Sequence, residues 1–563
     1  MAYIALLLGV LYILVAPTGR YIARVFCGES TLLTPLIRPI EKGIYRFSGV
    51  DEGREMSWRT YSAALLIFNT LGVIAVFLLE ELQGFLPLNP QNHGSVRWDT
   101  ALNAAVSFAT NTNWQSYAGE ETMSYLTQML GLTVQNFLSA VVGLAAAAAI
   151  IRSFARKNSD TIGNFWVDLT RLLLYVLLPL AVIWALALAS QGVVQTLGPY
   201  VTAQTLDGEE QVIAVGPAAS QDAIKFVGTN GGGFFNSNSA HPLENPTPLT
   251  DFLQVLGMLL ISASLPFALG SMLNNNGWGK AIFEAMLVLY LMGLAVTLSV
   301  EMQGNPIIDD LGVAGGANME GKEQRFGTIS SAIFAHSTTA TSCGGVDSMH
   351  DSMMPLTGLV LLFNMMVEEV IFGGVGVGLI GMLFYAVLTM FLAGLMIGRT
   401  PEIFGKKLEP FEMIMASVAL LAPSVALLLL AGLAVTLPEG LSSLNNMGPH
   451  GLSEILYAFA SACGNNGSAF SGLNSNTVFY NLATALGMIV GRLAIILPAL
   501  AMAGSLAQKK IVPASSATLP VASPLFVIML VGTILIVGAL TFFPVFALGP
   551  ILEHLLLQSG TTF

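Results

Sequence analysis

Long runs of apolar residues without a charge are the feature of this sequence that most limits its fold. A helix needs about 20 apolar residues to cross the hydrocarbon core of a bilayer, and runs of this kind recur along all 563 residues. Only 10% of the residues are charged, whereas soluble domains carry about 25%. The sequence therefore predicts an all-α polytopic membrane protein. It excludes a cytosolic enzyme and a disordered chain.

The remaining charges and the cysteines exclude further classes. The net charge is −12, whereas a nucleic-acid-binding protein needs a basic surface. No nucleic-acid partner is therefore expected, and the lipid bilayer is the expected surrounding. Cys27, Cys343 and Cys463 are too few and too scattered for a disulfide framework or a Cys-x-x-Cys metal site.

Ten apolar runs are bounded by charges, Pro or Asn/Gly clusters. We expect transmembrane helices at residues 2–15, 61–79, 128–151, 172–189, 252–272, 281–300, 356–397, 413–435, 478–503 and 524–548. The first run is short and ends at Pro17, before Arg20 and Arg24. Because no small-residue cleavage site follows, we interpret it as an uncleaved span and not as a signal peptide.

The seventh run, 356–397, is far too long for one straight crossing. It contains Gly373, Gly374, Gly376 and Gly378. Clustered glycines are where a membrane helix can break, provided that the irregular backbone is enclosed by protein or lines a wet cavity. We therefore expect a helix broken at these glycines.

The Lys and Arg residues set the orientation. The alternate loops 16–60, 152–171, 273–280, 398–411 and 504–520 hold seven, four, one, three and two of the 22 Lys and Arg residues. The positive-inside rule makes these loops cytoplasmic and puts both termini outside. Acidic residues gather in the opposite loops, where a negative surface raises the local concentration of cations.

Each outer loop between a rising and a falling helix contains a segment of one kind. A short amphipathic helix and an aromatic residue lead into a run of Thr, Asn, Ser and Gly, near residues 107–114, 225–233, 334–345 and 459–468. Aligning Thr112, Gly231, Gly344 and Gly467 gives spacings of 119, 113 and 123 residues. This period predicts four tandem units of helix, pore loop and helix. We place the units at 61–151, 172–273, 281–397 and 411–504, with one further helix in 1–60 and one in 521–563.

These loops have the chemistry of a cation selectivity filter. Rings of backbone carbonyls can replace the hydration shell of a cation, and glycine allows the backbone conformations in which carbonyls converge. Single Gly/Asn runs are also typical of ordinary turns, but four of them at one period on one face favour a pore. The expected filter residues are Thr110, Asn111, Thr112, Thr229, Asn230, Gly231, Ser342, Cys343, Gly344, Asn465, Asn466 and Gly467.

The first unit departs from the pattern, because Thr112 stands where the others have glycine. Fourfold symmetry is therefore broken at this position. Gln115 follows the first segment, and we expect its uncharged amide to line the outer vestibule, where it suits a hydrated cation.

At these motifs the sequence resembles the potassium-binding subunits (KdpA) of the bacterial Kdp potassium-transporting ATPases. The resemblance covers essentially the whole chain. It rests on NTNWQSY at 111–117, GTNGGGFFN at 228–236, AHPLENP at 240–246, TTATSCG at 338–344, GRTPE at 398–402 and CGNNGSAF at 463–470. The resemblance implies a fold similar to those of potassium channels and the Trk and Ktr transporters, with four pseudo-repeats and ten spans.

The resemblance also implies a division of labour in the bacterial inner membrane. This chain would select periplasmic K⁺ and pass it through an intramembrane tunnel to a P-type ATPase subunit. A periplasmic-side accessory subunit and a small single-span peptide would complete the complex. The chain itself has no Gly-x-x-x-x-Gly-Lys-Ser/Thr loop and no Asp-Lys-Thr-Gly site. We therefore expect no catalytic site and no bound ATP on this chain.

The predicted spans contain a few charged residues, among them Arg492, Glu368 and Glu369. Arg492 is flanked by apolar residues, and a charge there costs at least about 2.5–3.5 kcal/mol on insertion scales. It is either a barrier below the filter that diverts K⁺ sideways or one half of a structural pair with a carboxylate. The resemblance implicates this arginine in function. Adjacent helical positions diverge by about 100°, so at most one of Glu368 and Glu369 faces the pore. Our hypothesis is that this glutamate attracts the ion at the tunnel entrance, while the glycine break with Gly373 and Gly374 acts as a gate. The resemblance favours Glu369 for this role.

Two functional hypotheses remain open from the sequence. The first is an ion-selecting subunit that depends on an ATP-driven partner. The second is a self-sufficient Trk-like channel or ion-coupled symporter, which would share the filter but would not need a partner. A purely structural membrane scaffold, the third possibility, would bind no ion.

Overall fold

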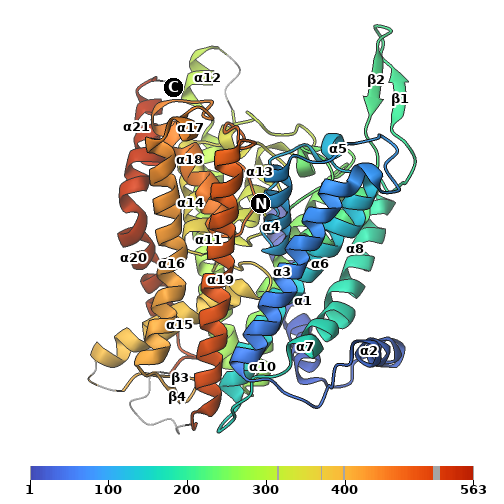
Figure 1. Cartoon of the computed structure of the whole chain (residues 1–563). Helices are drawn as coiled ribbons and strands as arrows, with labels where there is room; N and C mark the ends of the chain where they lie inside the picture. Colours follow the sequence, from blue (N-terminus) through green and yellow to red (C-terminus); the bar gives the residue numbers. More distant parts are fainter. Residues whose placement is uncertain are drawn as a thin grey trace.

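Helices form most of the described part of the molecule. The structure is a computed structural model, and it describes residues 2–312, 316–368, 370–396, 398, 400–511 and 520–561. Within this part of the chain, ten helices are long and apolar enough to cross a membrane, which confirms the predicted all-α membrane fold (Figure 1). They are Tyr3–Cys27, Trp58–Phe85, Thr127–Ala155, Phe165–Ser190, Pro248–Met272, Asn276–Asp310, Val377–Met396, Pro410–Thr436, Val478–Gln508 and Pro524–Gln558.

Short helices and turns join or extend these spans. The α-helices are α1 (Ala2–Cys27), α2 (Thr34–Ser48), α3 (Trp58–Leu82), α4 (Trp98–Ala109), α5 (Gly119–Thr122), α6 (Val134–Ala155), α7 (Phe165–Leu172), α8 (Leu178–Ser190), α9 (Ala218–Val227), α10 (Pro248–Met272), α11 (Asn276–Gln303), α12 (Pro306–Asp310), α13 (Gly327–Ala340), α14 (Pro355–Met366), α15 (Val377–Met396), α16 (Pro410–Thr436), α17 (Pro438–Leu441), α18 (Gly448–Cys463), α19 (Val478–Gln508), α20 (Pro524–Phe546) and α21 (Leu552–Gln558). Three π-helical turns lie within spans: η2 (Thr127–Thr133), η3 (Leu173–Leu177) and η6 (Ala547–Ile551). The described 3-10 turns are η1 (Gln83–Phe85), at the end of the second span, and η4 (Asn238–Ala240) and η5 (His350–Ser352), in loops.

The described strands form two small antiparallel hairpins. Strands β1 (Val201–Gln204) and β2 (Glu210–Ile213) pair with Val201 opposite Ile213, and they project from the upper end of the bundle in Figure 1. Strands β3 (Glu402–Ile403) and β4 (Lys406–Lys407) lie at the lower end. The two hairpins therefore mark the opposite ends of the helical bundle.

One pattern of helices occurs four times along the chain. A long helix is followed by a short helix, a loop and a second long helix: α3, α4, α6; α8, α9, α10; α11, α13, α14–α15; and α16, α18, α19. The second helices are 67–83% buried over their most apolar windows, and the first helices only 22–50%. The second helices therefore form an inner wall around the loops, with the first helices outside it. In α6 the inner wall includes the fully buried alanines 145–149, whose small side chains allow neighbouring helices to pack closely.

The seventh predicted span is broken at its glycines, as expected. Helix α14 ends at Met366 and α15 begins at Val377. Between them Gly376 has a φ of +90°, and a Cβ atom there would overlap the backbone of Gly143 on α6. The broken segment therefore lies directly against the inner wall.

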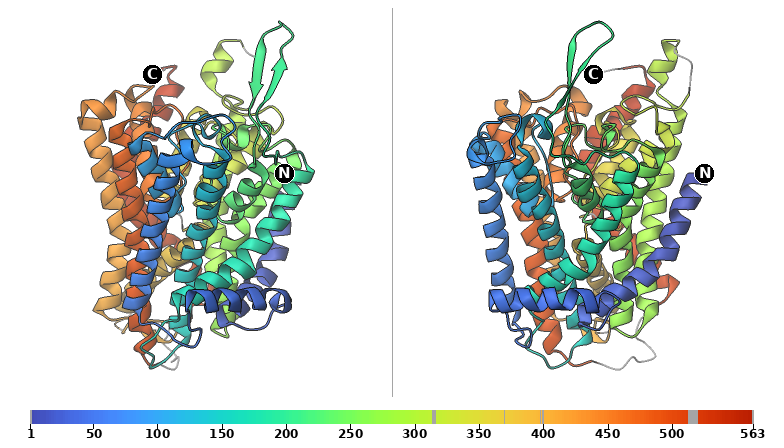
Figure 2. Two further views of the ribbon diagram at one scale, coloured as in Figure 1. Left: turned by 45° about the vertical axis from the view of Figure 1, so that its right-hand side comes forward. Right: turned by 90° about the vertical axis from the view of Figure 1, so that its right-hand side faces the viewer.

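The first span is longer than predicted. Helix α1 continues through Pro17 to Cys27 and does not end at residue 15. The prediction was wrong because packing outweighs the local stop signal: Gly19 lies against the backbone of Ser264 on α10, where a Cβ atom would overlap it. Helix α2 then lies across the lower end of the bundle, roughly perpendicular to the spans (Figure 2).

Candidate functional site

The four polar loops meet at the centre of the molecule through side-chain hydrogen bonds. Asn111 of the first loop donates from Nδ2 to the carbonyl oxygen of Thr229 in the second, at 2.9 Å. Ser342 of the third donates from Oγ to the carbonyl oxygen of Asn465 in the fourth, at 2.9 Å. Asn465 in turn donates from Nδ2 to Oγ1 of Thr112, at 2.9 Å. These bonds connect the first loop to the second, the third to the fourth, and the fourth back to the first.

Three glycines bring the loop backbones into direct contact. Gly231, Gly344 and Gly467 have φ angles of +78°, +82° and +97°. A Cβ atom on each would overlap a carbonyl oxygen of the next loop: that of Cys343 for Gly231, Asn466 for Gly344 and Thr112 for Gly467. Only glycine satisfies both the left-handed conformation and the close approach. Together with the side-chain bonds, these contacts close the four loops into one ring.

The backbone angles give the register between the loops. Each loop has two left-handed residues separated by one residue: Asn111 and Asn113, Thr229 and Gly231, Ser342 and Gly344, and Asn465 and Gly467. The glycines therefore correspond to Asn113, and the alignment through Thr112 was wrong by one residue. Asparagine adopts the left-handed region more readily than most other residues, which explains how it can stand where the other loops have glycine.

The residue between each left-handed pair shows the same register. The four intervening residues are Thr112, Asn230, Cys343 and Asn466, and their amides donate to the carbonyl oxygen five residues earlier at distances of 3.0, 2.7, 3.1 and 2.8 Å. Thr110, in contrast, caps the end of α4, and its hydroxyl contacts the carbonyl oxygen of Val106 and the hydroxyl of Thr112. Thr110 therefore belongs to the end of α4 and contacts the first loop through the hydroxyl of Thr112.

The helices before the loops all end at the ring. Helices α4, α9, α13 and α18 each end two residues before the first left-handed residue of the following loop. The C-terminal end of a helix carries a partial negative charge. Four such ends near one ring favour a cation at its centre.

A buried ion pair supports the second loop. Lys225 at the end of α9 lies 2.8 Å from Glu244 and 3.6 Å from Asp222, and all three side chains are fully buried. Burial acts to lower the pKa of Lys225, but the Glu244 and Asp222 carboxylates outweigh it, so the pKa lies above its usual value. The other oxygen of Glu244 accepts the amides of Phe234 and Phe235 at 2.7 and 2.9 Å. The pair thus fixes the chain that leaves the second loop.

Two amide side chains connect neighbouring loops beyond the ring. Gln115 accepts the amide of Gly233 at its Oε1, at 3.0 Å, and donates from its Nε2 to the carbonyl oxygen of Gly233, at 3.1 Å. Asn238 donates to the carbonyl oxygen of Gly231 at 2.8 Å and accepts the amide of Val346 at 3.2 Å. Gln115 was singled out from the sequence and Asn238 was not, because an isolated asparagine after a glycine run is equally typical of a helix cap.

The glycine break lies against the start of the second and third loops. The amide of Val375 donates to Oγ1 of Thr229 at 2.9 Å, and a Cβ atom on Gly374 would lie 3.1 Å from that of Ser342. The structure therefore brings Gly374 to the ring, whereas Gly373 contacts Gly378 at the start of α15.

Arg492 reaches the same region from α19. Its Nη2 donates to the carbonyl oxygen of Ser139 on α6 at 2.8 Å, and the hydroxyl of Ser139 donates to Oδ1 of Asn111 at 2.9 Å. Gly143, one turn along α6, lies between Arg492 and the backbone of Val375. Arg492 is thus linked both to the first loop and to the glycine break. Ser139 was not predicted, since nothing in the sequence distinguishes it from other helical serines.

Glu368 is the one of the two adjacent glutamates that the structure describes. Glu369 lies outside the described residues. Glu368 is buried, with 6% exposure, and neither of its carboxylate oxygens has a hydrogen-bond partner among the described residues. A buried acidic side chain therefore lies at the start of the glycine break.

Comparisons with known proteins agree with this architecture. A family model described as potassium-transporting ATPase A subunit matches residues 5–555. Two relatives called potassium-transporting ATPase potassium-binding subunit come from Methylorubrum populi, 56% identical over 560 residues (100% of this chain and 98% of the relative), and Brucella anthropi, 54% identical over 555 residues (99% and 98%). The crystal structure of the potassium transporter TrkH from Vibrio parahaemolyticus shares the fold, with a TM-score of 0.53 and 15% identity over 86% of this chain and 97% of that one. The chain therefore belongs to the family of potassium-transporting ATPase A subunits.

Proposed function

We propose that this chain is the potassium-binding and potassium-translocating subunit of an ATP-driven uptake complex, and that the ring of four loops is its selectivity filter. One observation carries the proposal: four loops from distant parts of the chain close into a ring, each with the same pair of left-handed residues. The names of the relatives, which combine potassium binding with a potassium-transporting ATPase, support it.

The filter residues follow from the corrected register. The segments are Asn111, Thr112 and Asn113; Thr229, Asn230 and Gly231; Ser342, Cys343 and Gly344; and Asn465, Asn466 and Gly467. Carbonyl oxygens of these segments would replace the hydration shell of K⁺. Because every side chain in the set is uncharged, selection would depend on carbonyl geometry and not on simple charge attraction.

The ion path would turn sideways below the filter. The glycine break with Gly373 and Gly374 would be the gate, and Arg492 would be the positive charge that stops K⁺ from running straight through. Glu369 would attract the ion at the tunnel entrance. Restored assembly and transport in a variant that exchanges Glu369 and Arg492 would count against separate roles, because it would show that the two act mainly as an ion pair.

The partners and the orientation are also part of the proposal. A P-type ATPase subunit would hydrolyse ATP, and a periplasmic-side accessory subunit and a small single-span peptide would complete the complex. The basic loops would face the cytoplasm of a bacterial inner membrane, with both termini in the periplasm. The acidic loops would then surround the entrance to the filter.

Calorimetric titration of the purified complex with K⁺ and with Na⁺ tests the filter. In Gly231→Asp a carboxylate would replace a glycine that touches the next loop, and we expect the preference for K⁺ over Na⁺ to fall at least tenfold. Gly208→Asp is the matched control, since Gly208 has a similar φ of +86° but nothing within 4 Å of its Cβ position. Unchanged selectivity in Gly231→Asp would remove the filter assignment.

The fold shared with TrkH favours one competing function, a self-sufficient channel or ion-coupled symporter. Reconstitution of this chain alone in liposomes distinguishes the two. A channel would pass rubidium without a partner, whereas we expect this chain to pass none above the background of empty liposomes until its ATPase partner and ATP are added.

A further inference from the structure

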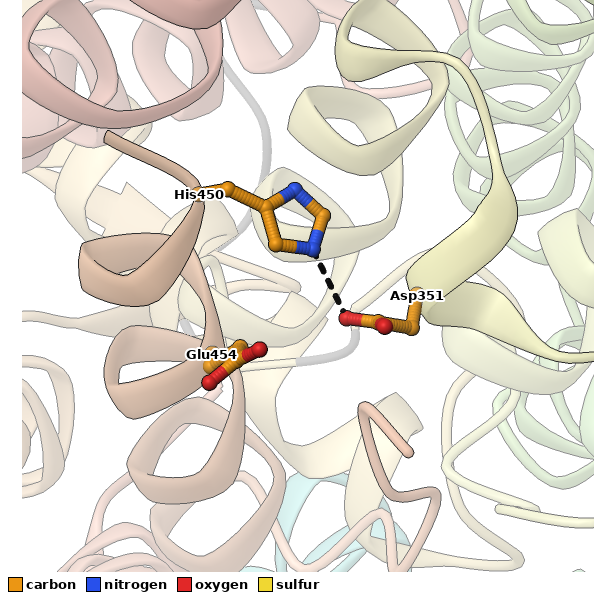
Figure 3. Close-up of side chains that lie close together, drawn as sticks. All are labelled: Asp351, His450 and Glu454. Atoms are coloured by element: carbon orange, nitrogen blue, oxygen red, sulfur yellow. Dashed lines mark hydrogen bonds and ion pairs between the residues drawn. The ribbon is translucent and has the colours of Figure 1, made fainter. Parts of the chain in front are cut away.

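A second group of potential ion ligands lies away from the ring, near the upper end of the bundle. Asp351 of η5 faces His450 and Glu454, which lie one turn apart on α18 (Figure 3). One ligand atom from each of the three side chains lies within 4.8 Å of the others. The turn η5 follows the third loop of the ring and α18 leads into the fourth.

The imidazole ring of His450 contacts a carboxylate at each of its two nitrogens. Its Nδ1 lies 2.7 Å from Oε1 of Glu553 on α21, and its Nε2 lies 2.9 Å from Oδ1 of Asp351. Metal-ligating histidines almost always use one ring nitrogen to contact a carboxylate or a carbonyl, which orients the other nitrogen toward the metal. Glu553 supplies this second contact, so Nε2 of His450 is already directed into the group.

The two carboxylates that face Nε2 are also positioned. Glu454 accepts hydrogen bonds from Nδ2 of Asn446 at 2.9 Å and from the amide of Asn445 at 3.3 Å. Gly472 lies against both carboxylates: a Cβ atom there would be 3.0 Å from Oδ2 of Asp351 and would overlap Oε1 of Glu454. The absence of a side chain at Gly472 leaves room for the two carboxylates to converge.

The charges of this group are unbalanced. Three carboxylates, from Asp351, Glu454 and Glu553, surround one imidazole, and in the described part of the chain none of them pairs with a Lys or Arg. The Glu454 side chain is fully buried, whereas those of Asp351, His450 and Glu553 are each 13% exposed. A cation could therefore enter from the exposed side and balance charges that protein groups leave uncompensated.

We propose that Asp351, His450 and Glu454 bind one divalent transition-metal ion, with Zn²⁺ as the best fit, and that Glu553 orients His450 from outside the coordination sphere. An imidazole nitrogen with carboxylate oxygens is a ligand set that Zn²⁺ accepts at about 2.0–2.2 Å, with water able to complete four-coordination. Mg²⁺ and Ca²⁺ prefer oxygen ligands throughout. The site is separate from the K⁺ filter.

A metal at this site would hold together segments that support the fourth loop. His350, next to Asp351, contacts the hydroxyl of Tyr457 at 2.7 Å, and that hydroxyl contacts Oγ of Ser468 at 2.8 Å. The amide of Ser468 donates to Oδ1 of Asn466 in the ring at 3.1 Å. Metal binding would thus fix η5 and α18 relative to each other and stabilise the outer support of the filter.

The test measures Zn²⁺ binding to the purified complex after treatment with a chelator. We expect one Zn²⁺ per chain by elemental analysis, binding at least tenfold tighter than that of Mg²⁺ or Ca²⁺, and a melting temperature that rises with Zn²⁺. The isosteric changes Asp351→Asn and Glu454→Gln should each weaken Zn²⁺ binding at least tenfold. His554→Gln, which changes the histidine next to Glu553, should leave it unchanged.

Two results would overturn the proposal. One is no Zn²⁺ binding by the wild-type complex, which would make the group a purely structural set of ion pairs. The other is equal Zn²⁺ binding by wild type and by both carboxylate variants, which would show an adventitious ion bound elsewhere. Circular dichroism of the same variants in the presence of the chelator shows whether they are folded. The two conservative carboxylate changes keep the test decisive, because one of them remains if the other variant does not fold.

Discussion

Asn113 shows how a single residue can keep the ring closed without repeating its chemistry. The other three loops place glycine at this position with positive φ. Asn113 reaches the same conformation with a φ of +57°, and its Nδ2 donates to Oδ1 of Asn136 on α6 at 2.6 Å. A left-handed conformation costs a residue with a Cβ about 1–2 kcal/mol, and this hydrogen bond helps to offset that cost. The first loop therefore differs from the other three in its side chain at this position, while all four loops share the same backbone geometry.

The close contacts of the ring glycines can be tested at Gly344. In Gly344→Ala the new methyl group would overlap the carbonyl oxygen of Asn466, so the third and fourth loops would have to move apart. The φ of +82° at residue 344 is also unfavourable for alanine. We expect the affinity for K⁺ to fall at least tenfold, as measured by titration of the purified complex. Gly358→Ala on α14 is the matched control: Gly358 is also buried, but its nearest neighbour would be 4.0 Å from the new methyl group. Equal losses in the two variants would indicate general destabilisation and would contradict the role of the ring.

Most of the ring residues could be predicted from the sequence, and their register could not. Gly231, Gly344 and Gly467 stand out because glycine is strongly tied to left-handed backbone. Asn113 does not stand out, because asparagine is equally common in turns and caps. Contacts such as Ser139 with Asn111 join residues of different helices, and no local pattern encodes them.

At the scale of elements, helix α2 is held to the bundle by one buried carboxylate. Glu41 is 1% exposed and accepts hydrogen bonds from Arg38 and Tyr45 of α2, from Arg171 of α7 and from Tyr175 of η3, at 2.8–2.9 Å. Four donors on three elements meet at this side chain. Glu41 therefore fixes the helix that crosses the lower end of the molecule in Figure 2.

Neutralising this carboxylate should release α2. In Glu41→Gln the charge that balances the two arginines is lost, at a cost of about 1–3 kcal/mol. We expect amide hydrogen exchange across residues 34–48 to become at least fivefold faster. Glu52→Gln is the control, because Glu52 contacts the same two arginines but its side chain is 40% exposed, where an ion pair contributes less than about 1 kcal/mol. Exchange that accelerates equally in both variants would contradict the special role of Glu41.

The same contact predicts a dependence on pH. Burial acts to raise the pKa of Glu41, but hydrogen bonds from Arg171, Arg38 and the two tyrosines outweigh it and place the pKa below its usual value. The unfolded carboxyl group, with a pKa of about 4.3, then takes up its proton at a higher pH than the folded one. The stability that Glu41 gives to the docking of α2 is fully present above the pKa of the unfolded carboxyl group. It is lost as the pH falls through the pKa of the folded one. In wild type we therefore expect amide hydrogen exchange across residues 34–48 to become faster below about pH 4.3. In Glu41→Gln we expect no such acceleration at low pH.

The elements were predictable to different degrees. The ten spans follow from hydropathy, and the break between α14 and α15 follows from its glycines. The lower end of α1 was misjudged, because packing of Gly19 on α10 is a tertiary effect. The contacts of α2 with α7 depend on Glu41 and Arg171, which are 130 residues apart, and no local signal joins them.

At the scale of the whole molecule, Arg492 is the charge that would separate the filter from the cytoplasmic side. If its positive charge is a barrier, Arg492→Gln should raise passive rubidium flux through the reconstituted complex, without ATP, at least tenfold. Arg492→Lys keeps the charge and should keep the flux low. Flux that stays at the wild-type level in Arg492→Gln would mean that the charge of this arginine is not the barrier, and the barrier would have to be placed elsewhere.

Anomalous scattering from rubidium in crystals of the complex would show whether the four loops form one potassium-selective ring. Rubidium replaces K⁺ and reveals its own position. We predict an anomalous peak inside the ring, enclosed by Thr112, Asn230, Cys343 and Asn466, that disappears in Gly231→Asp. A peak found only outside the ring, or one that persists unchanged in Gly231→Asp, would show that the ring is not the selectivity filter.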